Sequence, residues 1–271
     1  MTAGAGLKVL DLTVIVLTYN EEPNISRSLN SVKWAERIIV IDSGSSDRTV
    51  AIAKSFPNVT VVSRAFTTHA DQWNFGLEQV QTSWTLTMDA DYVLPETAAG
   101  AIRAAMLKEH AGFNAPFHYL VYGRRVKGSV LPPRTILFRT GHGKYWQDGH
   151  TQQLQLQGSL GLLPFHVSHD DRKTLSRWLQ SQISYSRQEA EKITSRPGTR
   201  LGRNDRIRKS IVLAPPLIFL LVYVLRGGVL SGWRGLFYAL QRLVAELLLS
   251  LFLIDIKLQS LVQQSDSQGS E

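Results

Sequence analysis

The sequence predicts an α/β fold in which helices flank a mainly parallel, Rossmann-like sheet, with an amphipathic helical appendage towards the C-terminal end. Short apolar runs recur along residues 12–89, and turn residues bound each of them. Helical patterns separate these runs, and such alternation is typical of a parallel sheet. An apolar stretch at 229–254, with its charges gathered on one side, predicts the appendage.

The predicted strands and helices follow one another in strict alternation. The strands are an apolar run from Leu12 that breaks into polar residues at 18–22, the runs 37–42 and 59–62, and a run that ends at Asp89. The predicted helices are one capped by Asn24 or Ser26 and ending near Trp34, one opened by Asp47 and ending at Lys54, and two at 69–81 and 95–109.

Polar side chains follow three of these strands, at the edge where open sheets of this kind bind ligands. Because side chains alternate along a strand, Asp89 and Asp91 are expected to point the same way and to hold one divalent cation. Mg²⁺ and Mn²⁺ prefer such oxygens and complete their shells with water and phosphate oxygens. The pattern indicates a nucleotide-diphosphate site, although Asp-x-Asp more commonly caps a helix or turn.

Four ordered signatures resemble those of the family 2 glycosyltransferases with a GT-A fold, and more narrowly the branch of lipopolysaccharide core glucosyltransferases and their relatives. They are Thr18-Tyr19-Asn20-Glu21-Glu22, Asp42 to Thr49, Asn74 within a helix, and Met88-Asp89-Ala90-Asp91. The resemblance covers roughly residues 10 to 255. It implies transfer of a single hexose from a nucleotide-diphosphate sugar to a lipid-linked or lipopolysaccharide-type acceptor of the cell envelope. The expected donor is a UDP-sugar.

The resemblance also implies residue roles. Asp42 would recognise the uracil or its ribose, Asp89 would face the ribose, and Asp91 would bind Mg²⁺ or Mn²⁺ with His169 completing the metal shell. The full set implied to bind the nucleotide-sugar is Thr18, Tyr19, Asn20, Glu21, Asp42, Gly44, Asn74, Asp89 and Ala90. The chain departs from the family pattern at Trp73, where many relatives carry a basic residue, and we expect Trp73 to pack in the core.

An inverting transfer requires a carboxylate that takes the proton from the acceptor hydroxyl. Asp148 is the first candidate, in a polar turn where related sequences often read Asp-Gly-His followed shortly by Glu, whereas here Gln152 and Gln153 follow. Asp170, beside His169, is the second candidate. No covalent nucleophile is required, which agrees with a chain that lacks Cys.

The charge distribution predicts the organisation of the chain. We expect a catalytic domain at 1–195, with a nucleotide-sugar half at 10–95 and an acceptor half at 96–195, then a basic and amphipathic region at 196–258 and a disordered polar tail at 259–271. The formal net charge is +8, and a basic cluster at 196–209 precedes an apolar run at 211–225 that is broken by Pro215-Pro216 and too short to cross a bilayer.

These patterns favour an anionic membrane surface as a partner. We expect the chain to bind the cytoplasmic face of the inner membrane as a peripheral or monotopic protein, through a helix that lies in the interface and does not span the bilayer. The alternative is a helical pair that packs on the catalytic domain or forms a homodimer. Nucleic-acid binding is disfavoured, because no aromatic and basic residues interleave on a recognisable platform. Two other functions stay open: transfer to a polyprenyl phosphate, and a catalytically silent protein that binds nucleotide at the membrane.

Overall fold

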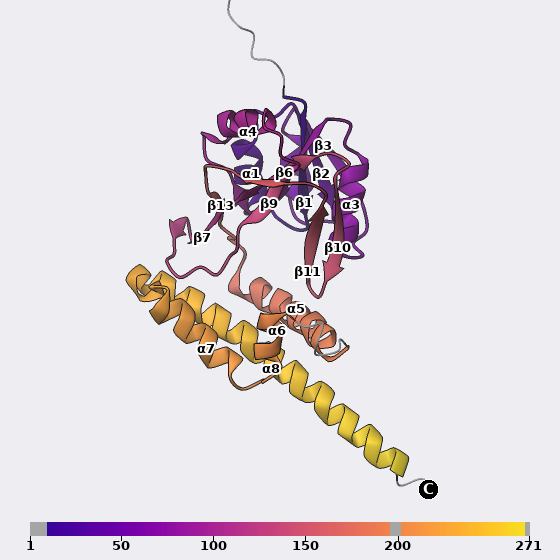
Figure 1. Ribbon diagram of the computed structural model, residues 1–271, viewed down its shortest axis with the longest axis vertical. Coiled ribbons are helices and arrows are strands. Elements are labelled where there is room, and N and C mark those ends of the chain that lie inside the picture. The colour runs from indigo at the N-terminus through magenta and orange to yellow at the C-terminus, as the bar shows by residue number, and fades with distance from the viewer. Residues whose placement is uncertain (1–9, 196–201, 269–271) are drawn as a thin grey trace, which may run out of the picture. The chain divides into compact units, whose positions relative to one another are not determined.

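The computed structural model describes residues 10–195 and 202–268 (Figure 1). It divides into two compact units. The sheet unit holds the described residues up to 125, with 131–147 and 151–172, and the helical unit holds 126–130, 148–150 and the described residues from 173 onwards. The helix at 175–195 therefore belongs to the helical unit, whereas the sequence suggested a catalytic domain that continues to residue 195.

A seven-stranded sheet forms the centre of the sheet unit, in the order β12-β6-β9-β4-β1-β2-β3. Its strands are β1 (Leu12–Thr18), β2 (Arg37–Asp42), β3 (Val59–Ser63), β4 (Trp84–Asp89), β6 (Gly112–Ala115), β9 (Arg134–Arg139) and β12 (Leu160–Leu162). β3, β2, β1 and β4 are parallel, and β9 runs antiparallel to both β4 and β6. The predicted α/β class with a mainly parallel sheet is confirmed, with β9 as an antiparallel insertion.

Helices cover both faces of this sheet. They are α1 (Ile25–Ser31), α2 (Thr49–Lys54), α3 (His69–Glu78) and α4 (Ala98–Met106). Because side chains alternate along β1, Val14 and Val16 pack with α1, α2 and α4 on one face, while Ile15 packs with α3 on the other. This two-sided burial explains why the central strands are mainly apolar.

Two smaller sheets complete the sheet unit. The hairpin of β10 (Gly143–Asp148) and β11 (Thr151–Leu156) forms one of them. The other has the order β5-β13-β7-β8, with β5 (Tyr92–Val93), β7 (Phe117–Val121), β8 (Arg124–Arg125) and β13 (Val167–His169). The antiparallel pairing of β5 with β13 places His169 opposite Tyr92, and this register brings the end of β4 close to the second half of the chain.

The helical unit consists of α5 (Leu175–Ser195), α6 (Arg203–Arg208), α7 (Ala214–Leu220), a π-helical turn η2 (Leu221–Leu225), a 3₁₀ turn η3 (Gly228–Ser231) and α8 (Gly232–Gln268) (Figure 1). Pro215 and Pro216 begin α7 instead of breaking the apolar run, because the first helical positions need no amide donor.

The long α8 differs from the sequence-based expectation at its end. Residues 259–268, predicted as a disordered tail, continue the helix, and Gln259 donates to Asp255 one turn earlier at 3.0 Å. Adding residues to an established helix costs far less than nucleating one. Among the described residues one helix, Gly228–Ser265, is long and apolar enough to cross a membrane, and 39% of its apolar window is buried in the protein. The C-terminal region is therefore apolar enough to associate with a membrane.

Candidate active site

The carboxyl ends of β1 and β2 form a tight polar turn. Thr18 Oγ1 donates to Asp42 Oδ1 at 3.0 Å, and Asp42 Oδ2 accepts from the backbone amides of Gly44 and Ser45 at 3.0 and 2.9 Å. Gly44 has φ of +87°, which glycine adopts without strain. Asp42 is thus held in place by its own turn, and the predicted nucleotide residues Thr18, Asp42 and Gly44 lie together.

A second set of contacts joins the start of α1 to the same turn. Asn20 adopts φ of +54°, its amide donates to Ser45 Oγ at 2.7 Å, and its side-chain oxygen accepts from the amide of Ser46 at 2.7 Å. The buried Glu21 accepts from Asn24 at 2.9 Å, whereas the Tyr19 ring is exposed. The first two signatures therefore lie together at one edge of the sheet and present an exposed aromatic ring, as a surface that stacks on a nucleobase would require.

Asp89 and Asp91 are separated by one residue in the sequence but have different partners in the structure. β4 ends at Asp89, and Ala90 and Asp91 form a turn, so the alternation of a strand does not continue to Asp91. Asp89 lies 4.0 Å from Arg134 on β9, while Asp91 is buried and lies 3.0 Å from His169 Nε2 on β13. The structure brings Asp91 and His169 together, as predicted, and gives Asp89 a separate position.

The Asp91–His169 pair has the chemistry of a site for a divalent cation. Burial lowers the pKa of His169, but the charge and hydrogen bond of Asp91, together with the Asp89 and Asp171 charges, outweigh it and raise that pKa. Among the described residues, His169 Nδ1 is a buried atom without a hydrogen-bond partner, and no group of three His, Cys, Asp or Glu side chains forms a complete metal cage. A carboxylate and an imidazole fit Mn²⁺ or Mg²⁺ that is completed by substrate oxygens and water.

Asp170 is occupied by two guanidinium groups. Its Oδ2 lies 2.9 Å from Arg27 NH1 and 2.8 Å from Arg172 NH2, and its Oδ1 accepts from the amide of Gly123 at 3.1 Å. The carboxylate is almost completely buried. Asp170 thus anchors α1 and the 122–124 turn to the segment that follows β13, and its acceptor atoms are used within the protein.

Asn74 and Trp73 lie on α3 and have structural partners. The side-chain amide of Asn74 donates to the carbonyl of Tyr145 at 2.8 Å and accepts from its amide at 2.9 Å. Trp73 is buried and stacks on the Tyr145 ring with centroids 5.4 Å apart, so its predicted core packing is confirmed. These contacts fix the β10–β11 hairpin on α3.

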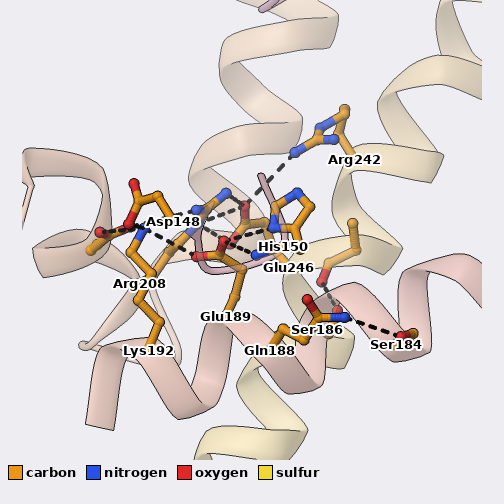
Figure 2. A network of polar contacts seen from close by, with 12 residues as sticks. Asp148, His150, Ser184, Ser186, Gln188, Glu189, Lys192, Arg208, Arg242 and Glu246 are labelled. Atoms are coloured by element: carbon orange, nitrogen blue, oxygen red, sulfur yellow. Dashed lines mark hydrogen bonds and ion pairs between the residues drawn. The ribbon is translucent and has the colours of Figure 1, made fainter. Parts of the chain in front are cut away.

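Asp148 belongs to the helical unit, where it is part of a buried network of charges (Figure 2). Lys192 on α5 lies 3.3 Å from Asp148 Oδ1, 3.2 Å from Asp205 Oδ2 and 3.6 Å from Glu189 Oε2. Arg208 on α6 contacts Glu246 on α8 at 2.7 Å. α5 thus contacts the turn 148–150 directly, α6 and α8 are linked to it through this chain of ion pairs, and Lys192 supplies the counter-charge for Asp148.

Glu189 was not predicted, although it contacts the motif that the sequence singled out. Its Oε1 lies 2.6 Å from His150 Nδ1 (Figure 2). Burial raises the pKa of Glu189, but the hydrogen bond and charge of His150, with the charge of Lys192, lower it to about 2. The signal that could have identified it is the buried face of α5, where Glu189 and Lys192 alternate with Ser186, Ala190 and Ile193 at helical spacing.

The chain is similar to several known proteins. The chain matches the model of glycosyl transferase family 2 over residues 13–154. It is 25% identical over 252 residues to the lipopolysaccharide core biosynthesis glycosyltransferase LpsC of Rhizobium meliloti (strain 1021), covering 85% of this chain and 87% of that protein. An uncharacterized glycosyltransferase of Rickettsia bellii is 37% identical over 81 residues, which cover 30% of this chain and 27% of that protein.

A solved structure shows the same fold. The mannosyltransferase PcManGT from Pyrobaculum calidifontis, in complex with GDP-Man and Mn²⁺, matches with a TM-score of 0.52 at 15% identity, covering 93% of this chain and 87% of that chain. At that identity the likeness concerns the fold alone.

Proposed function

We propose, from the premise that this chain belongs to glycosyltransferase family 2, that it transfers a single hexose with inversion from a nucleotide-diphosphate sugar to a lipopolysaccharide-type acceptor. The observation that carries the proposal is the buried Asp91–His169 pair at 3.0 Å. β4 pairs with β1 so that Asp89 lies opposite Leu17, and therefore the pair and the Asp42 turn belong to the same edge of the sheet. Ligands of open α/β sheets bind at this edge.

On the donor side, the carboxylates must recognise hydroxyls and base N–H groups, because they repel phosphate. We assign Tyr19 to the base, Asp42 and Asp89 to the uracil or ribose, and the backbone of Ala90 to the same ligand. Asp91 and His169 would hold a divalent cation, which when bound neutralises charge on the diphosphate leaving group. The order of the four signatures and the ring exposure of Tyr19 support this assignment.

On the acceptor side, we assign the general base to Asp148. Its role is to accept the proton of the sugar hydroxyl as that oxygen attacks the anomeric carbon from the face opposite the diphosphate. Lys192 balances its charge in the resting protein. Asp170 is less suited to this role, because Arg27, Arg172 and the Gly123 amide already occupy its oxygens.

The similarity to a lipopolysaccharide core enzyme over 85% of the chain supports an acceptor of that class. The helical unit supports a position at the membrane, because α8 is long and apolar and the segment before it is basic. We therefore propose that the enzyme works on the cytoplasmic face of the inner membrane, as a peripheral or monotopic protein.

Calorimetry with UDP and GDP, each with and without Mn²⁺, tests the site. We expect one nucleotide to bind only with Mn²⁺ in the native chain, and Asp91→Ala to abolish that binding. Glu96→Gln, a change at an exposed position, is the matched control and should bind as the native chain does. Equal binding without metal, or none to either nucleotide, would refute the assignment of Asp91.

A transfer assay with the nucleotide-sugar that binds then separates the acceptor classes. Product on a lipopolysaccharide core saccharide supports the proposal. Product on polyprenyl phosphate alone would replace it with the lipid-phosphate function, and metal-dependent binding without product on either acceptor would indicate the catalytically silent protein.

A further inference from the structure

The helical unit leaves a continuous apolar stripe exposed along its hairpin of helices. On α8 the exposed apolar residues fall on one face at helical spacing, opposite the buried side that contains Tyr238, Ala245 and Leu249. The stripe on α8 consists of Trp233, Leu240, Leu247, Leu251, Ile254, Leu258, Leu261 and Val262. α7 and η2 add Leu217, Leu220 and Val224, again on one face. Such a surface needs a partner.

The turn that joins η2 to α8 carries the most exposed part of this surface. Trp233 is 86% exposed, and Leu225 and Leu230 are each 71% exposed. Arg226 and Arg234 lie beside them and are exposed as well. We name residues 225–234 the tip. An indole with aliphatic and cationic neighbours suits the interface between lipid headgroups and acyl chains.

A short segment from another part of the chain is bound to the tip. Residues 126–130, which we name the strap, follow β8 in sequence and belong to the helical unit. The amide of Lys127 donates to Ser231 Oγ at 2.9 Å, the amide of Val130 donates to Tyr238 Oη at 3.3 Å, and Arg226 donates to the carbonyl of Ser129 at 2.9 Å. The strap is therefore held at several points.

Glycines allow the strap and the tip to pack backbone against backbone. Gly128 has φ of +90°, and a Cβ there would lie 2.4 Å from the carbonyl oxygen of Val222. The same Cβ would lie 3.3 Å from the backbone of Gly228, which belongs to the tip. A side chain at this position would separate the segments, so the close approach depends on glycine.

The charge of the hairpin identifies the partner. Residues 206–245 contain no Asp or Glu, and they carry Arg206, Arg208, Lys209, Arg226, Arg234 and Arg242. A symmetric dimer through the tip would bring the same exposed arginines together, which is unfavourable. Arg208 and Arg242 are paired with Glu246, whereas Arg226 and Arg234 are exposed at the tip. An anionic bilayer attracts these exposed cations and accommodates the apolar residues.

We propose that the tip inserts into an anionic bilayer and that the strap transmits this insertion to the acceptor half of the enzyme, so that turnover depends on membrane contact. The strap connects directly in sequence to β8 and β9, which belong to the sheet unit. This coupling rests on the proposed function, whereas insertion of the tip does not.

Co-sedimentation with vesicles tests insertion without any need for turnover. Native protein should bind vesicles of phosphatidylcholine mixed with phosphatidylglycerol more tightly than vesicles of phosphatidylcholine alone. The double change Leu230→Ser with Trp233→Ser should weaken binding roughly tenfold to hundredfold, because two large apolar side chains are lost. Leu107→Ser is the matched control, because Leu107 is 86% exposed and lies in the sheet unit.

Two outcomes would overturn insertion of the tip. One is native-like vesicle binding by the double variant. The other is a concentration-dependent dimer of the native chain in sedimentation velocity that the double variant abolishes, because that result would assign the tip to a second copy. Arg226→Gln with Arg234→Gln should reduce the preference for phosphatidylglycerol by roughly tenfold or more, because both exposed cations attract anionic lipid.

The strap is tested by hydrogen exchange and by turnover. Anionic vesicles should slow amide exchange at Lys127 and Val130 in the native chain and stimulate transfer to a soluble saccharide. Ser231→Ala with Tyr238→Phe removes two of the strap contacts and should keep vesicle binding while losing both effects. Stimulation that survives in this variant would overturn the coupling. Absence of transfer with normal exchange protection would instead contradict the proposed function.

Discussion

The Asp91–His169 pair of the sheet unit and the Asp148 network of the helical unit are both buried clusters of charge, but they are balanced differently. In the network, Lys192 neutralises Asp148 and Arg208 neutralises Glu246, so the chain supplies its own counter-charges. In the pair, Asp91 instead faces an imidazole, whose positive charge depends on its protonation. We therefore expect the stability of the fold to depend on the network, and the binding of Mn²⁺ and nucleotide to depend on the pair.

The largest expected effect tests whether Asp148 has a catalytic role or only a structural role in the network. Asp148→Asn should lower turnover by about 10² to 10⁴-fold, because an amide cannot accept the proton of the acceptor hydroxyl. Mn²⁺-dependent nucleotide binding by calorimetry should be unchanged. If turnover were retained and only the melting temperature fell, Asp148 would have a purely structural role, and the whole network would serve stability alone.

The next effect concerns Asp170, the buried carboxylate that the sequence offered as a second base. Asp170→Asn should destabilise the folded chain by about 3 kcal/mol or more, because Arg27 and Arg172 lose their shared counter-charge. Urea unfolding measures this loss, with Glu96→Gln as control. A variant with native stability and no turnover would reassign the base to Asp170.

Acid should weaken the buried charge network of the helical unit. The pKa of Glu189 is lowered from 4.5 to about 2 in the folded chain, so its stabilising contribution is present above pH 4.5 and is lost as the pH falls towards 2. Unfolding followed by circular dichroism between pH 5 and about 2 should show this loss in the native chain. In the Glu189→Gln variant the free energy of unfolding should change less with pH over this range. A pH dependence identical to that of the native chain would contradict the charge assigned to Glu189.

The smallest effect addresses the cation site. His169→Gln should reduce Mn²⁺ affinity by about 10 to 100-fold without abolishing it, because Asp91 and the diphosphate would remain as ligands. Calorimetric titration of Mn²⁺ in the presence of the bound nucleotide measures the change. Full native affinity would show that the imidazole orients Asp91 from outside the coordination shell.

The central sheet could be predicted because each strand carries its own signal. The runs that start at Leu12 and Arg37 are mainly apolar and mainly buried, as burial on both faces requires, and the run at Val59 is a shorter apolar strand at the edge of the sheet. The direction of β9 could not be predicted in the same way. The alternation of 134–139 is identical for a parallel and an antiparallel strand, and only its distant partners β4 and β6 decide between them.

The site was predictable where function depends on residues near one another in sequence. The turn of Asp42 and Gly44 is such a case, since its hydrogen bonds span two or three residues. The divergence of Asp89 from Asp91 was not predictable, because it depends on where β4 ends and on Arg134 and His169. The helical spacing of α5 indicates that Glu189 is buried, but the sequence around it does not indicate that its partner is His150, which lies in a distant turn.

Asn74 shows how a single side chain can replace part of a strand. Its amide makes both hydrogen bonds to the backbone of Tyr145 that a neighbouring strand would otherwise make. The edge of β10 is therefore closed at this residue by an amide from a helix, and at this point it offers no free template for pairing with another chain. Loss of this side chain would leave the amide and the carbonyl of Tyr145 without these two hydrogen bonds, at a buried position where an unpaired backbone group is costly.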